Sequence, residues 1–147
     1  MKLLKLYSWM AGSMSDFAKP FKENENLYKQ ATAFWNKLEN SSTVILLICL
    51  VLGIAIAAFY YTSYNNRPGR HYTPKFWALM LVITFALTFG ATFGFEYLSV
   101  KPTLQGATML EIKIALCNSL YAVFVYFLTS VVWCKWLPTN AYRLFKF

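Results

Sequence analysis

The amino-acid sequence predicts an all-α integral membrane protein with three transmembrane helices, preceded by an N-terminal amphipathic or interfacial helical region. The first observation is composition: 58% of the 147 residues are hydrophobic and only 14% are charged, whereas soluble domains carry about 25% charged residues. A soluble protein of this size would leave too much of that apolar surface in water. A disordered chain is excluded because such chains are poor in apolar residues. The second observation is the position of the charges.

The few charged residues are placed so that three long stretches contain no charge. These stretches cover residues 40–66, 76–95 and 114–134. A helix rises about 1.5 Å per residue, so about twenty residues match a hydrocarbon core of about 30 Å. We therefore predict transmembrane helices at about 43–63, 75–98 and 112–134.

Two other architectures fit these stretches less well. The buried helices of a soluble bundle would each show a polar stripe of Lys and Glu, and none of the three does. A membrane-spanning barrel needs alternating segments of about ten residues, and residues 45–52 do not alternate. We expect two parts: the amphipathic N-terminal region at 1–42, and a three-helix transmembrane domain with a short basic tail at 43–147.

Two helical patterns occupy the N-terminal region. The first recurs every three or four residues, at Leu3, Leu6, Met10, Met14, Phe17 and Phe21. The second consists of Leu27, Ala31, Phe34 or Trp35, and Leu38. Ser15 or Asp16 is expected to cap a new turn, and Pro20 to break the first pattern. The basic apolar segment lies either flat among anionic headgroups or docked on a partner protein, and both alternatives stay open.

The connections between spans are marked by turn-forming residues. Residues 65–70 predict a turn after the first span, which we expect to begin at N-caps among residues 41–43. Pro74 suits the first turn of the second span. The aromatic residues expected to form an interfacial belt around the turn are Tyr60, Tyr61, Tyr64, Tyr72 and Trp77.

Three spans place the two termini on opposite sides of the membrane. Near the membrane, six basic residues accompany the 62–74 loop and the C-terminus, against four on the other side. That count favours the loop and the C-terminus on the positive side, cytoplasmic or matrix. The remaining N-terminal lysines reverse the count, so the orientation of the N-terminus stays open.

The sequence offers little for catalysis or metal binding. His71 is the only histidine, and no cysteine pair or carboxylate cluster stands near it, so we expect no metal site. Phosphate-binding, serine-hydrolase and zinc-protease motifs are missing. Cys117 and Cys134 are about 25 Å apart along one helix and cannot bridge, so we assign them and Cys49 to packing. We expect no catalytic residue, and no cofactor beyond structural lipids.

The second span carries the most informative pattern. Its rows recur every four residues: the small residues Ala86, Gly90 and Gly94, the threonines Thr84, Thr88 and Thr92, and the phenylalanines Phe85, Phe89 and Phe93. Small residues allow two helix backbones to approach closely. The threonines either line a polar cavity or pore, with Glu96 at its mouth, or bond carbonyls of their own helix. Both interpretations stay open.

Polar residues inside or beside the spans need partners. Glu96 and Lys113 are predicted to pair across the second and third spans, because a carboxylate at membrane depth needs a cation. Asn118 lies about one turn inside the third span, and its amide needs a partner, usually on another helix. A small face formed by Ala115, Ser119 and Ala122 lies beside it. We expect this group to associate helices, with ligand binding by Asn118 as the alternative.

These features favour a non-catalytic structural or accessory subunit of a larger membrane complex. Respiratory or ATP-synthase complexes and bacterial envelope or secretion machines fit, in a bacterial or mitochondrial inner membrane. The alternative is a homo-oligomeric channel or membrane-permeabilising effector lined by the threonine row. A transporter or membrane enzyme is disfavoured, because intramembrane charges and paired carboxylates are missing. The expected partners are other membrane subunits and anionic lipid headgroups, without nucleic acid, and further copies of the chain in the alternative.

Overall fold

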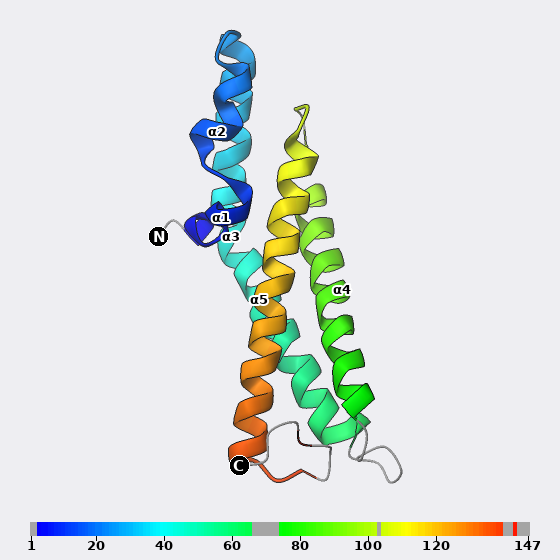
Figure 1. Ribbon diagram of the computed structural model, residues 1–147. Helices are drawn as coiled ribbons and strands as arrows, with labels where there is room; N and C mark the ends of the chain where they lie inside the picture. Colours follow the sequence, from blue (N-terminus) through cyan, green and yellow to red (C-terminus); the bar gives the residue numbers. More distant parts are fainter. Residues whose placement is uncertain (1–2, 66–73, 103, 140–142, 144–147) are drawn as a thin grey trace. The chain divides into compact units, whose positions relative to one another are not determined.

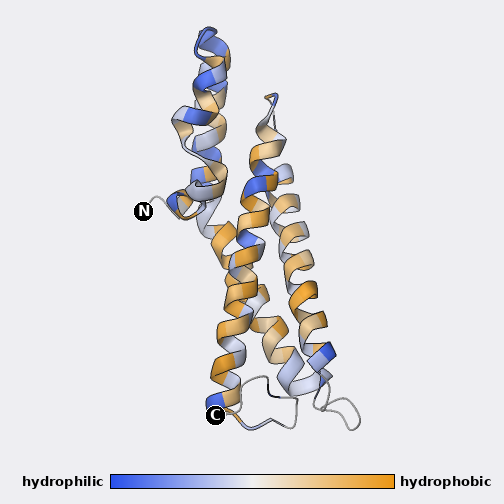
Figure 2. Cartoon of the chain, viewed as in Figure 1, coloured by the Kyte–Doolittle hydropathy of each residue, from blue (hydrophilic) through white to orange (hydrophobic). Residues whose placement is uncertain are grey.

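Three long helices dominate the computed structural model of the chain, which describes residues 3–65, 74–102, 104–139 and 143 (Figure 1). They are α3 (Glu25–Phe59), α4 (Pro74–Ser99) and α5 (Ala107–Trp136), and the described residues contain no strand. All three are long and apolar enough to cross a membrane. Figure 2 shows apolar residues along most of α4 and α5. The predicted all-helical class with three candidate spans is therefore confirmed.

The N-terminal region is a series of short helical segments. They are η1 (Leu3–Tyr7), α1 (Ser8–Ala11), α2 (Met14–Ala18) and η2 (Lys19–Phe21). Gly12, with a φ of 79°, interrupts the predicted helix. Ser13 then begins α2 with a capping box: its hydroxyl accepts from the Asp16 amide, and the Asp16 carboxylate accepts from the Ser13 amide. The predicted N-cap at Ser15 or Asp16 was wrong, because Ser13 is the N-cap and Asp16 is the third residue of α2.

The break at Gly12 also changes which side chains are buried. Leu4 and Tyr7 are buried, whereas Leu6, which was predicted on the apolar face, is 46% exposed. The 3.6-residue spacing that predicted one continuous face holds only for a continuous helix. The second predicted pattern fits better, because Ala31, Phe34, Trp35 and Leu38 of α3 are all buried.

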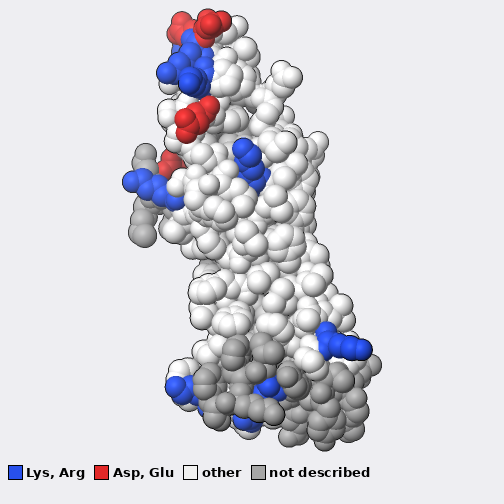
Figure 3. Space-filling model, in the orientation of Figure 1, with Lys and Arg blue, Asp and Glu red and all other residues white. Residues whose placement is uncertain are grey.

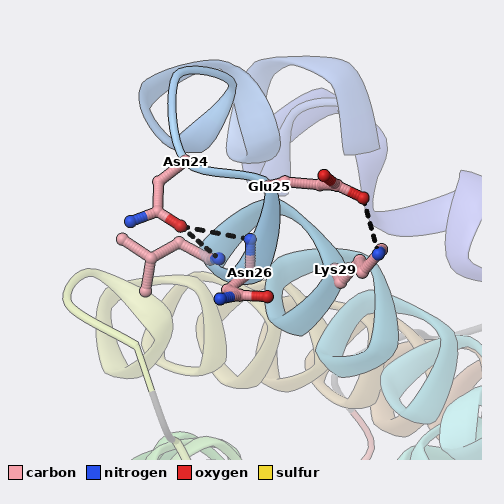
Figure 4. Close-up of polar contacts among 5 residues, drawn as sticks. Asn24, Glu25, Asn26 and Lys29 are labelled. Carbon is pink, nitrogen blue, oxygen red and sulfur yellow. Dashed lines mark hydrogen bonds and ion pairs between the residues drawn. The ribbon is translucent and has the colours of Figure 1, made fainter.

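Helix α3 begins with an asparagine cap. The Asn24 side-chain oxygen accepts from the amides of Asn26 and Leu27, at 3.1 and 3.3 Å (Figure 4). An exposed pair, Glu25 and Lys29, follows one turn apart at 2.6 Å. Residues 25–39 contain two glutamates and two lysines, and the uncharged stretch begins directly after them. The first part of α3 is therefore its polar part.

The first span does not begin with a new helix at residues 41–43, as the sequence had predicted. Helix α3 runs through this point, and the Ser42 hydroxyl donates to the Glu39 carbonyl inside it. A helix already formed propagates more easily than a new one nucleates. At about 1.5 Å per residue the 35 residues of α3 span about 52 Å, which exceeds a hydrocarbon core of about 30 Å. If α3 crosses a membrane, its length therefore places its charged N-terminal part beyond the apolar layer.

The ends of the long helices carry the charged groups. In Figure 3 lysines, arginines and acids gather near helix ends, while the surface over the middle of the helices is uncharged on the face shown. Helix α3 passes into a π-helical turn, Tyr60–Tyr64, which Asn65 closes by donating its amide to the Tyr60 carbonyl. The remainder of the predicted 65–70 turn, with His71 and Tyr72, lies outside the described residues. Helix α4 begins at Pro74, as predicted.

The chain divides into two compact units, each built from parts of the three long helices. Unit 1 comprises Met1–Leu47 and Phe89–Asn118, and unit 2 comprises Ile48–Thr88 and Ser119–Phe147. In unit 1 the N-terminal region packs on α3 through Phe17, whose ring centroid lies 5.8 Å from that of Phe34 and 6.2 Å from that of Trp35. The predicted division after residue 42 stays a prediction.

Unit 2 has an aromatic core. Its buried members are Ala57, Tyr60, Tyr61, Trp77, Met80, Tyr126 and Cys134. The Trp77 indole donates to the Ser130 hydroxyl at 3.2 Å, and the Tyr126 hydroxyl donates to the Trp77 carbonyl at 3.3 Å. Tyr60 and Tyr61 were predicted to face the membrane interface, and this was wrong, because both are almost fully buried. Their polar ends bond within the chain, Tyr61 to Cys134 at 3.5 Å and Tyr60 to Asn65 at 2.8 Å.

Candidate functional site

Asn118 is the centre of a buried hydrogen-bonded cluster in unit 1, which we call the Asn118 cluster. Its amide nitrogen donates to the Ile45 carbonyl and to the Thr92 hydroxyl, both at 2.8 Å. Its amide oxygen accepts from the Tyr7 hydroxyl at 3.0 Å. Tyr7, Thr92 and Asn118 are all fully buried. Both amide N–H groups and the amide oxygen of Asn118 therefore have partners.

The Asn118 cluster joins four segments of unit 1. Ile45 belongs to α3, Thr92 to α4, Asn118 to α5, and Tyr7 to the N-terminal region. A buried amide without partners is costly in an apolar environment, so these bonds favour one arrangement of the four segments. The expected role of Asn118 in associating helices fits this geometry. Tyr7 was missed as a partner, because nothing in the sequence distinguishes it from an interfacial aromatic residue.

The three threonines of α4 are all fully buried but bond in different ways. In unit 2 the Thr84 hydroxyl donates to the carbonyl of Met80, four residues earlier, and the Thr88 hydroxyl has no partner in the part of the chain that the structure describes. In unit 1 Thr92 belongs to the Asn118 cluster. The interpretation as carbonyl-bonding threonines thus applies to Thr84 alone. All three side chains are enclosed by other residues of the described chain, so none of them lies on its outer surface.

The small residues of α4 lie on the outside. Ala86 and Gly90 are exposed and Gly94 is half-buried. A Cβ atom added to Gly90 or Gly94 would lie within 4 Å of no described atom outside its neighbouring residues and the backbone of its own helix turn. The predicted packing face of α4 is therefore unoccupied within the described part of this chain. On α5, by contrast, the predicted small residues Ala115, Ser119 and Ala122 are all fully buried.

A close contact between two helices occurs at Gly53. A Cβ atom at Gly53 of α3, in unit 2, would lie 2.8 Å from Val125 Cγ1 and 2.9 Å from the Ala122 carbonyl oxygen. Helices α3 and α5 therefore approach so closely here that no larger residue fits. A single glycine inside an apolar run carries no sequence signal for this role.

The structure does not bring Glu96 and Lys113 together as an ion pair. Both Glu96 carboxyl oxygens are buried and have no hydrogen-bond partner within the described residues, whereas Lys113 is exposed. The reason is geometric: the two residues belong to the same end of the second and third spans, but their side chains face different surroundings. The sequence shows that both residues lie at the same end of their helices. It does not show the direction in which each side chain points.

A second acid of unit 1 is buried in the same way as Glu96. Glu111 of α5 is also fully buried, and its carboxyl oxygens have no hydrogen-bond partner among the described residues. A pair of buried carboxylates was not expected from the sequence, because these two are far apart along the chain. No cluster of three potential metal ligands occurs in the part of the chain that the structure describes, so the two acids have no third ligand there.

We expect Glu96→Gln to leave the folded chain at least as stable as the natural one. A buried carboxyl group without a partner loses its hydration and gains no bond, whereas a glutamine of the same size is neutral. The thermal unfolding midpoint of the purified protein in detergent should stay the same or rise, and Lys113→Gln should leave it unchanged. A drop of several degrees with both substitutions would instead reveal a Glu96–Lys113 pair.

The three cysteines are buried, and none of them forms a disulfide in the described part of the chain. Comparison of the chain with models of protein families, with curated proteins and with solved structures yields no match. The candidate site is therefore described by its geometry alone. It consists of the buried Asn118 cluster of unit 1 and the open glycine face on the outer surface of α4.

Proposed function

We propose that this protein is a non-catalytic structural or accessory subunit of a larger membrane complex, which another transmembrane helix joins through the outer face of α4. The observation that carries the proposal is the open surface at Gly90 and Gly94. In membrane proteins small residues spaced four apart mark the places where helices pack closely, because the gain comes from backbone proximity. Gly53 shows such a contact already made within the chain.

The arrangement of polar groups in unit 1 supports the same proposal. Thr92 points inward to Asn118, while Gly90 is exposed, so the polar and the small rows of α4 are separated. The inner row stabilises the chain's own fold. The outer row is then available to a partner. Respiratory or ATP-synthase complexes and bacterial envelope machines, in a bacterial or mitochondrial inner membrane, are the assemblies proposed.

The test is the composition of the detergent-extracted native complex, measured by native mass spectrometry. We expect the natural chain to be extracted with different chains, and the double substitution Gly90→Leu and Gly94→Leu to release it. Because both glycines border open space, the variant chain should keep its helical content and have an unfolding midpoint at least as high as that of the natural chain.

The matched control is Ala55→Leu, an equally small-to-large change at an exposed position of α3. It should leave the complex intact. A natural complex that contains only copies of this chain would contradict the heteromeric proposal and favour the homo-oligomeric channel. An unchanged complex in the double glycine variant would show that α4 is not the contact.

A further inference from the structure

A pocket in unit 1 combines one acid and one lysine at the level where the third span begins. It has a volume of about 310 Å³, and its wall includes Trp9, Asp16, Phe17, Met109 and Lys113. Asp16 and Phe17 come from the N-terminal region, and Met109 and Lys113 from the first turns of α5. Within the described residues Asp16 and Lys113 form no ion pair with each other, although they line the same pocket.

The acid is prepared to accept a further hydrogen bond. Both bonds that Ser13 donates to Asp16 end on the Oδ2 atom, one from the backbone amide at 3.1 Å and one from the hydroxyl. The Oδ1 atom accepts none in the described part of the chain. Hydrogen bonds from Ser13 also hold the pKa of Asp16 below its usual value of 3.8, so the carboxylate is ionised at neutral pH.

The lysine marks the edge of the apolar layer. Lys113 is the last charged residue before twenty-one uncharged ones. The Tyr7 hydroxyl reaches Asn118, five residues further along α5, so this hydroxyl lies about 7.5 Å toward the apolar side of Lys113. Trp9, which follows η1, is 60% exposed, as an indole at a membrane interface is. The pocket thus lies at the depth of lipid headgroups.

We propose that this pocket binds the headgroup of a zwitterionic aminophospholipid of the phosphatidylethanolamine type. The lipid phosphate is held by the Lys113 ammonium. The primary ammonium of the headgroup donates to Asp16 Oδ1. The exposed Trp9 and Met109 side chains lie along the start of the acyl chains. A choline headgroup has no N–H to donate to Asp16, and a glycerol headgroup has no cation.

The experiment measures lipid retained on the purified full-length protein by native mass spectrometry. The protein is loaded separately with phosphatidylethanolamine, phosphatidylcholine and phosphatidylglycerol of the same acyl chains. We expect the first to be retained best. Asp16→Asn and Lys113→Gln should each reduce its retention roughly tenfold, the size of one lost charge-assisted hydrogen bond. Lys113→Arg should preserve it.

Two matched controls separate the pocket from general surface charge. Glu25→Gln and Lys29→Gln remove an exposed acid and lysine from α3 that do not line the pocket, and both should retain the lipid as the natural chain does. Asp16→Asn keeps an oxygen acceptor for the capping box, and its helical content should be unchanged. If the helical content of Asp16→Asn is altered, Asp16→Glu is measured instead. It keeps the negative charge at this position and should retain the lipid.

Three results would overturn the proposal. Equal retention of the three lipids would show that the headgroup is not recognised. Loss of all lipids with Lys113→Gln and no effect of Asp16→Asn would indicate a simple phosphate site. Soluble phosphoethanolamine that displaces the lipid at equal concentration would identify the ligand as a free metabolite, because a lipid should also gain from its acyl chains.

Discussion

Gly53→Ala is expected to destabilise the folded chain by about 1–3 kcal/mol, the typical cost of overpacking a close contact. The added methyl group would lie 2.9 Å from the carbonyl oxygen of Ala122. The neighbouring Val125 side chain can rotate, but the carbonyl belongs to the backbone of α5, so α3 and α5 must move apart. Thermal unfolding of the purified protein in a single detergent, followed by circular dichroism, measures the effect.

Gly94→Ala is the matched control for that prediction. It makes the same chemical change in a helix of the same class, but its new methyl group meets open space. Alanine is favoured over glycine in a helix interior by about 1 kcal/mol, so this variant should be as stable as the natural chain or slightly more stable. Equal unfolding midpoints for the two variants would contradict the close contact at Gly53.

Asn118→Leu is expected to cost about 2 kcal/mol and to loosen the N-terminal region. The substitution removes three hydrogen bonds, and interhelical hydrogen bonds in membrane proteins contribute about 0.6–2 kcal/mol each. It also leaves the Tyr7 hydroxyl and the Ile45 carbonyl buried without that partner. Hydrogen exchange followed by mass spectrometry should therefore show faster exchange in residues 3–11.

Tyr7→Phe separates the two consequences of that change. It removes a single bond of the Asn118 cluster and keeps the ring in place, so the loss of stability should be smaller, while residues 3–11 should still exchange faster. If the N-terminal region in Asn118→Leu exchanged as slowly as in the natural chain, the bond from Tyr7 would not be what holds it.

The spans were predictable because a membrane-spanning helix depends on the composition of a whole segment and not on single residues. A helix that crosses a hydrocarbon layer cannot tolerate many charges over about twenty residues, so the gaps between charges located α4 to within one residue at each end. They also located α5, although this helix begins five residues before the predicted span. The need of Asn118 for a partner was predictable for the same reason. Its partners were not, because an amide accepts any hydroxyl or carbonyl that the fold brings close.

Local signals were less reliable where two structures fit the same residues. Serine and threonine at 41–43 suit an N-cap, but they are tolerated within a helix when they bond an earlier carbonyl, as Ser42 does. The tyrosines after residue 59 suit a membrane interface equally well as an aromatic core. The Glu96–Lys113 pair failed because the sequence orders residues along a helix but does not say which way neighbouring helices face.

The most direct test of the account is the number of times the chain crosses the membrane. Single cysteines are introduced as Asn24→Cys, Gln105→Cys and Arg143→Cys at exposed positions, after the three natural cysteines are replaced by alanine. A membrane-impermeant maleimide is then added to sealed vesicles before and after permeabilisation. Three spans predict that positions 24 and 105 are labelled from one side of the membrane and position 143 only from the other. Labelling of all three positions from the same side would contradict the three-span architecture on which the proposed subunit depends.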